Sequence, residues 1–148
     1  MPVEPAELAE PVVPAEPVVV PGLEDASPFG YSQCVRVGPF VYVAGQCGLG
    51  PDHEIVSAEF EPQARAALDR VRRAVEAAGG TLADVVTMTV FVTDVRFGRV
   101  FTSMRRELFG TRLPASALVG VSSLMVPGAM VEVQATAVIG SGRDLPEG

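Results

Sequence analysis

Several residue types are missing from this chain, and each absence excludes a kind of site. Its 148 residues include no lysine, asparagine or tryptophan, so no lysine side chain is available to form a Schiff base. The single histidine, His53, rules out any site that needs two imidazoles, and a Ser-His-Asp triad would have to use it. Because His53 lies between Asp52 and Glu54 in a loop-like stretch, we expect it to be exposed and to take no part in chemistry.

Cysteine is also scarce, because Cys34 and Cys47 are the only two. Two cysteines do not make a disulfide framework, and with one histidine they cannot fill a four-ligand zinc site, so we expect no metal. The N-terminal residues lack the basic region and apolar core of a secretory signal. We therefore expect reduced thiols and a cytoplasmic location.

The charge and hydropathy patterns exclude two classes of partner. The formal net charge is −7, which argues against a main role in non-specific binding to nucleic acid or to an anionic membrane surface. No apolar run approaches the ~20 residues that a membrane-spanning helix needs. We therefore expect neither nucleic acid nor a membrane as a partner.

The chain divides into three parts. Residues 1–27 contain six prolines and show no helical period, so we expect a flexible, proline-rich extension in which only residues 18–20 could pair along a sheet edge. Residues 28–140 carry the patterns of one folded domain. Residues 141–148 are polar, and we expect them to form a loose tail.

The central part predicts an α+β domain. Alternating or β-branched apolar residues predict five strands, at residues 34–37, 40–46, 85–92, 116–121 and 130–139. Apolar residues at helical spacing predict two helices, at residues 58–78 and 97–110. The resulting order is β-β-α-β-α-β-β.

Two helices can cover only one face of such a sheet, which leaves the second face in need of cover. We therefore expect the chain to associate with copies of itself through the sheet. Glu132, Gln134 and Thr136 alternate with apolar residues in the last strand, so they share the second face, near a subunit junction.

Six groups of residues occur in the same order as motifs of the Rid family, also called YjgF-like or L-PSP endoribonuclease-like. These are residues 30–38 (GYSQCVRVG), 41–46 (VYVAGQ), 77–86 (AAGGTLADVV) and 89–94 (TVFVTD), with 113–115 (LPA) and 131–135 (VEVQA) in the two closing strands. The chain resembles this family over residues 28–140.

The resemblance implies a chorismate-mutase-like α+β layer, with two helices on one face of a mixed sheet, that assembles into a homotrimeric barrel. It also implies a small-molecule ligand in a cleft between subunits. Deaminating members of the family hydrolyse reactive enamines and imines to a keto compound and ammonia. They need no cofactor, so the resemblance predicts none here.

The resemblance also assigns site positions. It implies that Glu132 handles water and that Tyr31 lines the pocket, both as catalytic residues. Six further positions map to substrate binding: Ala44, Gln46, Cys47, Phe101, Ser116 and Ala117. Three of these depart from the family pattern, because Ser116 stands where an arginine grips the substrate carboxylate, Ala44 replaces a serine and Phe101 replaces a frequent asparagine.

The missing arginine bears directly on the substrate. Loss of a buried arginine–carboxylate pair costs about 3–5 kcal/mol when nothing replaces it. Arg112 is a poor replacement, because it lies four residues before Ser116, about 13 Å away along an extended strand. We therefore expect a different, more apolar small enamine, imine or carbonyl intermediate, in a dedicated metabolic or biosynthetic pathway.

Other interpretations stay open from the sequence. The chain could be a non-catalytic trimer that binds a small molecule, and the family's older name suggests a ribonuclease, which the acidic charge disfavours. Glu132 could be solvated on an exposed sheet face, and Tyr31 could be a packing residue. Cys47 could be a buried thiol or a reactive thiolate, and Ser116 could hydrogen-bond a ligand in place of the arginine.

Overall fold

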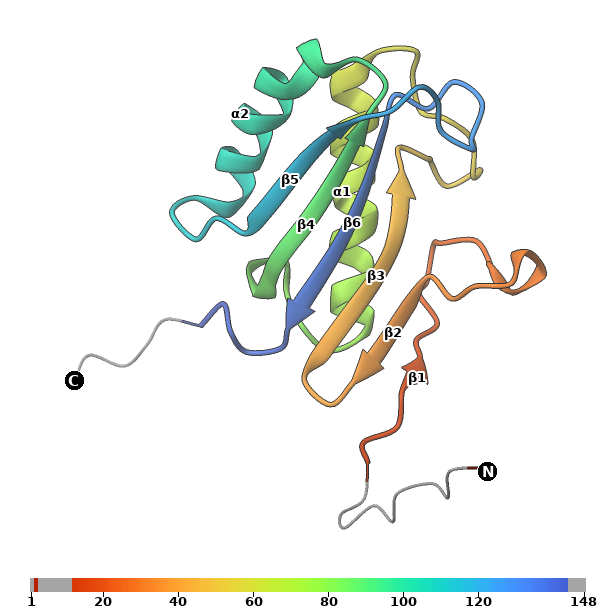
Figure 1. The fold of residues 1–148 in the computed structure, drawn as a ribbon, viewed down its shortest axis with the longest axis vertical. Coiled ribbons are helices and arrows are strands. Elements are labelled where there is room, and N and C mark those ends of the chain that lie inside the picture. The colour runs from red at the N-terminus through yellow and green to blue at the C-terminus, as the bar shows by residue number, and fades with distance from the viewer. Residues whose placement is uncertain (1, 3–11, 144–148) are drawn as a thin grey trace.

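A computed structural model describes residues 2 and 12–143. Six strands form one sheet in the order β1-β2-β3-β6-β4-β5, and two helices pack against it (Figure 1). The strands are β1 (Glu16–Pro17), β2 (Cys34–Val37), β3 (Phe40–Cys47), β4 (Val85–Val92), β5 (Ala115–Gly120) and β6 (Val131–Val138). The helices are α1 (Phe60–Ala77) and α2 (Gly98–Phe109). No helix in the described residues is both long and apolar enough to cross a membrane.

The predicted α+β class is confirmed, with each predicted helix and strand within two residues of its expected bounds. The sheet is mixed, because β4 and β5 run parallel while the other neighbouring strands run antiparallel. Along α1 the apolar stripe is buried and the opposite side is charged. Two ion pairs at i,i+4 spacing lie on that side, Glu61–Arg65 at 2.9 Å and Asp69–Arg73 at 2.8 Å.

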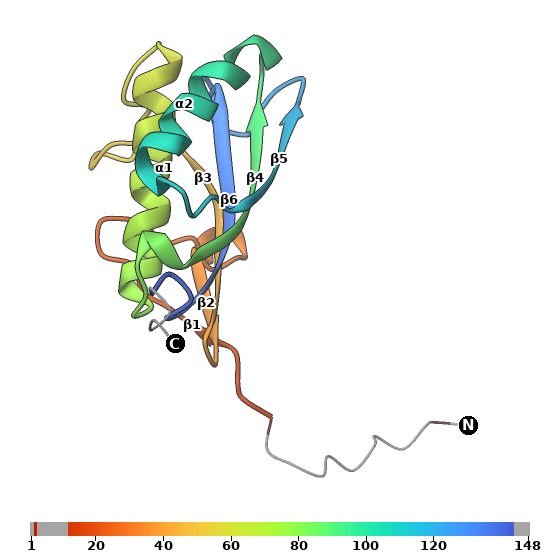
Figure 2. The same ribbon diagram turned by 90° about the vertical axis from the view of Figure 1, so that its left-hand side faces the viewer.

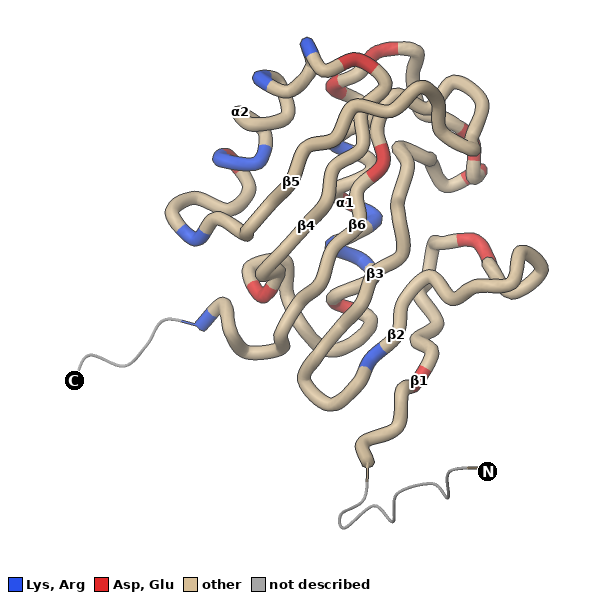
Figure 3. The backbone as a smooth tube through the Cα atoms, in the orientation of Figure 1, with Lys and Arg blue, Asp and Glu red and all other residues tan. Residues whose placement is uncertain are grey.

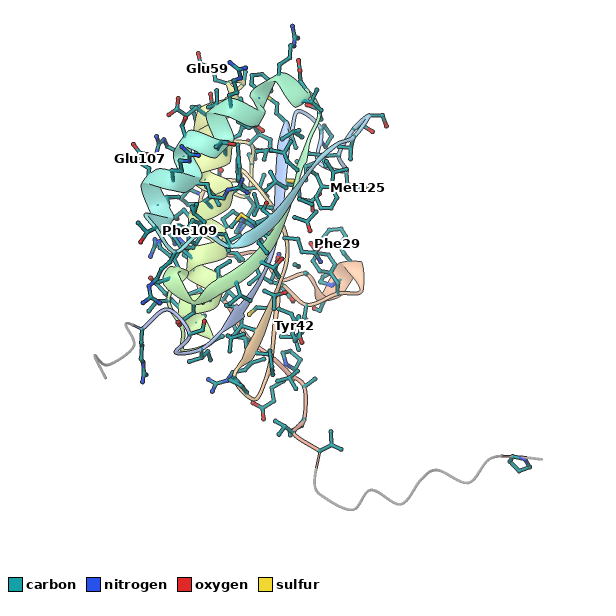
Figure 4. All side chains as sticks on the ribbon, turned by 60° about the vertical axis from the view of Figure 1, so that its left-hand side comes forward. Phe29, Tyr42, Glu59, Glu107, Phe109 and Met125 are labelled. Carbon is teal, nitrogen blue, oxygen red and sulfur yellow. The ribbon has the colours of Figure 1, made fainter. Side chains whose placement is uncertain are left out.

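The two faces of the sheet have different surroundings. In β6 the side chains of Val131, Val133, Ala135 and Ala137 are buried towards α1. Residues between them point to the other side, which no described helix covers (Figure 2). We call this side the open face. Figure 4 shows Phe29, Tyr42 and Met125 on this side, away from the two helices, and all three are exposed.

The N-terminal expectation needs correction for residues 16–27. Residues 1 and 3–11 of the expected extension lie outside the described residues. Glu16 and Pro17 pair with Arg36 and Val35 as β1, and Val20 and Ala26 are buried in the fold. Pro17 has no amide hydrogen to donate, but the amide of Val18 donates to the carbonyl of Cys34 at 2.9 Å, and the chain then packs against the domain. The packed domain therefore begins earlier than residue 28.

The end of the domain is also anchored over its described part. Gly142 donates its amide to the carboxylate of Asp84 at 2.8 Å, and the amide of Thr81 donates to the same carboxylate at 2.9 Å. Burial by itself would raise the pKa of Asp84, but these hydrogen bonds outweigh it, so the pKa lies below its usual value. The rest of the expected tail, residues 144–148, lies outside the described residues.

Gly48 marks the closest approach between the sheet and α1. It follows β3, and a β-carbon at this position would overlap the backbone of Gln63. The buried side chain of Gln63 donates to the carbonyls of Ser57 (2.8 Å) and Gly128 (3.0 Å) and accepts from the amide of Met130 (2.8 Å). The side-chain amide of Gln63 therefore holds the start of α1 against the turn before β6.

We predict that Gly48→Ala destabilises the protein by about 1–3 kcal/mol, because a helix backbone cannot move aside to admit a methyl group. Urea unfolding at fixed protein concentration measures this change. Gly45→Ala is the control, because the β-carbon there would meet only the flexible end of the Glu132 side chain. Equal stability of the two variants would contradict the packing described here.

Candidate functional site

Glu132 lies on the open face, near the start of β6. It pairs with Cys47 of β3 and with Phe91 of β4. The β3–β6 ladder shifts register between Val43 and Gln46, and this irregularity places Gly45 beneath the Glu132 side chain, where a β-carbon would overlap the carboxylate. Burial raises the pKa of Glu132, and no described residue donates a hydrogen bond to its carboxylate.

Tyr31 and Cys47 belong to the same region. Burial raises the pKa of Tyr31, and the negative charges of Glu24 and Glu132 raise it further. Burial, with a smaller contribution from Glu132, raises the pKa of Cys47 to about 12. These electrostatic couplings show that the structure brings three of the expected site residues, Tyr31, Cys47 and Glu132, near one another. Ala44 stands at the ladder irregularity beside them.

A cavity of about 570 Å³ borders Tyr31. Its other wall is the segment Pro17–Val20 with Leu23, the part of the N-terminal region that packs on the domain. Neither Glu132 nor Ser116 lines this cavity. This cavity therefore does not unite the expected site residues.

Gln46 points to the helix side, where it joins a buried polar network. It pairs with Val133, whose side chain is buried in the core. Its Nε2 donates to Oε1 of Gln33 (2.8 Å), and its Oε1 accepts from Nε of Arg70 (3.0 Å). Arg70 in turn binds the carboxylate of Glu24 at 2.6 Å. In this chain Gln46 positions the segment that carries Tyr31, rather than reaching the open face.

The Arg70–Glu24 pair of this network was missed by sequence reasoning. Burial by itself would raise the pKa of Glu24, but hydrogen bonds from Arg70, from its own backbone and from Gln33, together with the positive charge of Arg70, outweigh this effect, so the pKa is lowered. Arg70 lies on the inward side of α1, three residues after the buried Ala67 and four before the buried Ala74. That position was the only signal in the sequence that the guanidinium is buried.

The remaining expected residues lie around β5, at the edge of the described sheet. Ser116 pairs with Met88, which is buried on the helix side, whereas Ala117 pairs with Thr89 and faces the open side. Phe101 of α2 is wholly buried in the core. Within one chain, therefore, Ser116 and Phe101 lie on the opposite side of the sheet from Glu132.

Arg105 is a second residue that sequence reasoning missed. Its Nη1 donates to Oγ of Ser116 at 2.5 Å, and its guanidinium carbon lies 5.4 Å from the centre of the Phe101 ring. Basic residues are spaced along α2 (Figure 3), and Arg105 is one helical turn after Phe101. Arg112, the replacement considered from the sequence, donates instead to the carbonyl of Ser141 at 3.5 Å.

The family model described as Endoribonuclease L-PSP matches residues 24–139. The chain belongs to this family. A RutC family protein of Sulfurisphaera tokodaii is 39% identical over 95 residues, which is 64% of this chain and 76% of that protein. A 2-iminobutanoate/2-iminopropanoate deaminase of Dermatophagoides farinae is 33% identical over 110 residues, 74% of this chain and 85% of that protein.

Solved structures of the L-PSP family share the fold. The crystal structure of a Mycobacterium tuberculosis member of the YjgF/YER057c/UK114 family superposes with a TM-score of 0.74 and 36% identity, covering 85% of this chain and 100% of that one. The family resemblance inferred from the motifs is thus confirmed. The assignment of individual site residues stays a prediction.

We predict that neither cysteine reacts readily in the folded protein. Burial raises the pKa of Cys34 to about 11 and that of Cys47 to about 12, so the nucleophilic thiolate is scarce at neutral pH. Iodoacetamide labelling followed by mass spectrometry should give little modification of the native protein and two modified thiols after denaturation. Rapid labelling of native Cys47 would instead support the reactive thiolate that the sequence left open.

We predict that Gly45→Ala displaces the Glu132 carboxylate while the fold is kept, because the added methyl group occupies the place of the carboxylate oxygens. The apparent pKa of Glu132, followed by NMR titration, should shift while the unfolding midpoint changes little. An unchanged pKa together with an unchanged midpoint would show that Glu132 does not rest on Gly45.

Proposed function

We propose that this protein hydrolyses small, mostly apolar enamines or imines in a cleft between the subunits of a homotrimer. An enamine first shifts a proton to give the imine. Water then adds to the C=N carbon, and cleavage of the C–N bond leaves a keto compound and ammonia. The observation that carries the proposal is the half-buried Glu132 carboxylate with its raised pKa, in a family that includes imine deaminases.

The chemistry assigned to Glu132 follows from its surroundings. A carboxylate without a hydrogen-bond donor from the described chain is free to accept a proton from an attacking water molecule. A raised pKa makes the Glu132 carboxylate a better general base, and its protonated form can return that proton to the leaving nitrogen. Tyr31, with its phenol in the same region, orients the substrate by hydrogen bonding.

The arrangement of the sheet supports a site shared between chains. Glu132 faces the open side and Ser116 faces the helix side, so one chain cannot bring them together. A second copy laid against the open face would bury Phe29, Tyr42 and Met125, which are 78%, 48% and 97% exposed. Exposed apolar groups gathered on one side are typical of an interaction surface. The cytoplasmic location expected from the sequence belongs to the same proposal.

The replacements at family positions support the description of the substrate as mostly apolar. Ala44 offers no hydroxyl and Ser116 no charge, so the cleft has fewer polar groups of its own. Such a site fits an intermediate of a dedicated metabolic or biosynthetic pathway. The same replacements also suit a trimer that binds a small molecule without chemistry, which is the alternative outcome of the experiment below.

We predict that the protein accelerates keto-acid release from enzymatically generated 2-iminobutanoate or from a bulkier aromatic imine. Glu132→Gln should lower kcat by about 10²–10⁴-fold, the usual contribution of a general base. In the unchanged protein, kcat/KM should rise with pH through an apparent pKa above that of an ordinary glutamate, because the carboxyl must lose its proton to act. This rise of kcat/KM with pH should be absent in Glu132→Gln.

Glu107→Gln is the matched control, since Glu107 is an exposed glutamate on α2, and it should retain full activity. Ligand binding without acceleration of either imine would favour the binding trimer. RNA cleavage that survives purification and is lost in Glu132→Gln would favour the ribonuclease.

A further inference from the structure

We propose that Arg105 is the anion-binding residue of this cleft, and that its guanidinium, oriented by Ser116, grips a carboxylate on the substrate. The inference deepens the proposed function and rests on it for the location of the cleft. The expected substrate then carries one carboxylate and is otherwise apolar. The inference also assigns the charge recognition to a helix residue, since the strand position 116 carries only a hydroxyl.

The geometry leaves most of the guanidinium available. Nη1 donates to Oγ of Ser116, and the ring of Phe101 supports the group from within the core. An arginine has five N–H donors in a planar fork, and no described residue accepts a hydrogen bond from Nε or Nη2 of Arg105. Two contacts hold the group in place, and the remaining donors can bind both oxygens of a carboxylate.

The charge of Arg105 lacks a counter-charge within the described chain. Burial lowers its pKa, yet no described carboxylate lies within ion-pair distance. Arg36, Arg99 and Arg106 also lack an ion pair with a described residue, but they are exposed, whereas Arg105 is partly buried. A partly desolvated cation without a partner is unfavourable by itself and becomes favourable when an anion arrives.

The position of Arg105 fits a site at a subunit boundary. Its partner Ser116 belongs to β5, which pairs only with β4 in the described sheet and so forms its edge. Glu132 of the same chain faces the other side of the sheet. An acidic substrate bound by Arg105 would therefore meet the Glu132 carboxylate of a neighbouring copy.

The test compares two imines that differ in one group, 2-iminobutanoate and the neutral imine of butanone. Arg105→Gln should raise KM for 2-iminobutanoate by about 10- to 100-fold, the loss expected for a hydrogen bond to a charged group. Its kinetics with the neutral imine should stay within about threefold of the unchanged protein. Arg106→Gln, an exposed neighbour on the same helix, should behave as the unchanged protein with both.

A second variant distinguishes loss of carboxylate binding from a general disturbance of the structure. Ser116→Arg in the Arg105→Gln background returns a guanidinium to the same edge and should recover most of the affinity for 2-iminobutanoate. An equal loss with both imines, or no loss with either, would overturn the role of Arg105. Dissociation of the Arg105→Gln assembly, measured by light scattering, would also overturn this role. It would show that the guanidinium in the unchanged protein binds a neighbouring chain and not the substrate.

Failure of the proposed function can be told apart from failure of this inference. If the unchanged protein hydrolyses neither imine, NMR titration with 2-oxobutanoate measures carboxylate binding without chemistry. Binding at least about tenfold weaker in Arg105→Gln would uphold the anion site although the hydrolase proposal had failed. Equal binding by the two proteins, or binding by neither, would overturn the anion site itself.

Discussion

The organisation of this protein depends on a sheet that has helices on one side only. The buried residues of β6 alternate with Glu132, Gln134 and Thr136, so the side that lacks helices carries the polar groups of the last strand. Glu132 lies there on Gly45, partly withdrawn from water. Its raised pKa follows from this placement, since burial disfavours the charged form of a carboxyl group.

The same alternation separates the two charged groups that the proposed chemistry needs. Glu132 belongs to the open face, and Arg105 with Ser116 belongs to the helix side at the β5 edge. A small substrate cannot span the thickness of a sheet, so both groups can act on one molecule only if they come from different chains. Assembly would then be a requirement of catalysis as well as a way to cover apolar surface.

The local pattern of the sequence predicted both α-helices and every strand except β1. Period-two spacing predicted those strands, and helical spacing predicted the two helices. The site assignment stays a prediction: strand patterns are enough to make Cys47 and Glu132 ladder neighbours, whereas the Arg105–Ser116 contact depends on how α2 packs against β5. Ion pairs such as Arg70–Glu24 join distant segments, and no local pattern specifies such partners.

Subunit exchange between two variants, each impaired at 2-iminobutanoate concentrations well below KM, tests the shared site most directly. Glu132→Gln and Arg105→Gln proteins would be mixed in equal amounts, allowed to exchange chains, and assayed with 2-iminobutanoate. If each site takes its glutamate and its arginine from different chains, random mixing leaves about a quarter of the sites intact, and activity should rise far above the sum of the two variants. Activity equal to that sum after complete exchange would contradict the account.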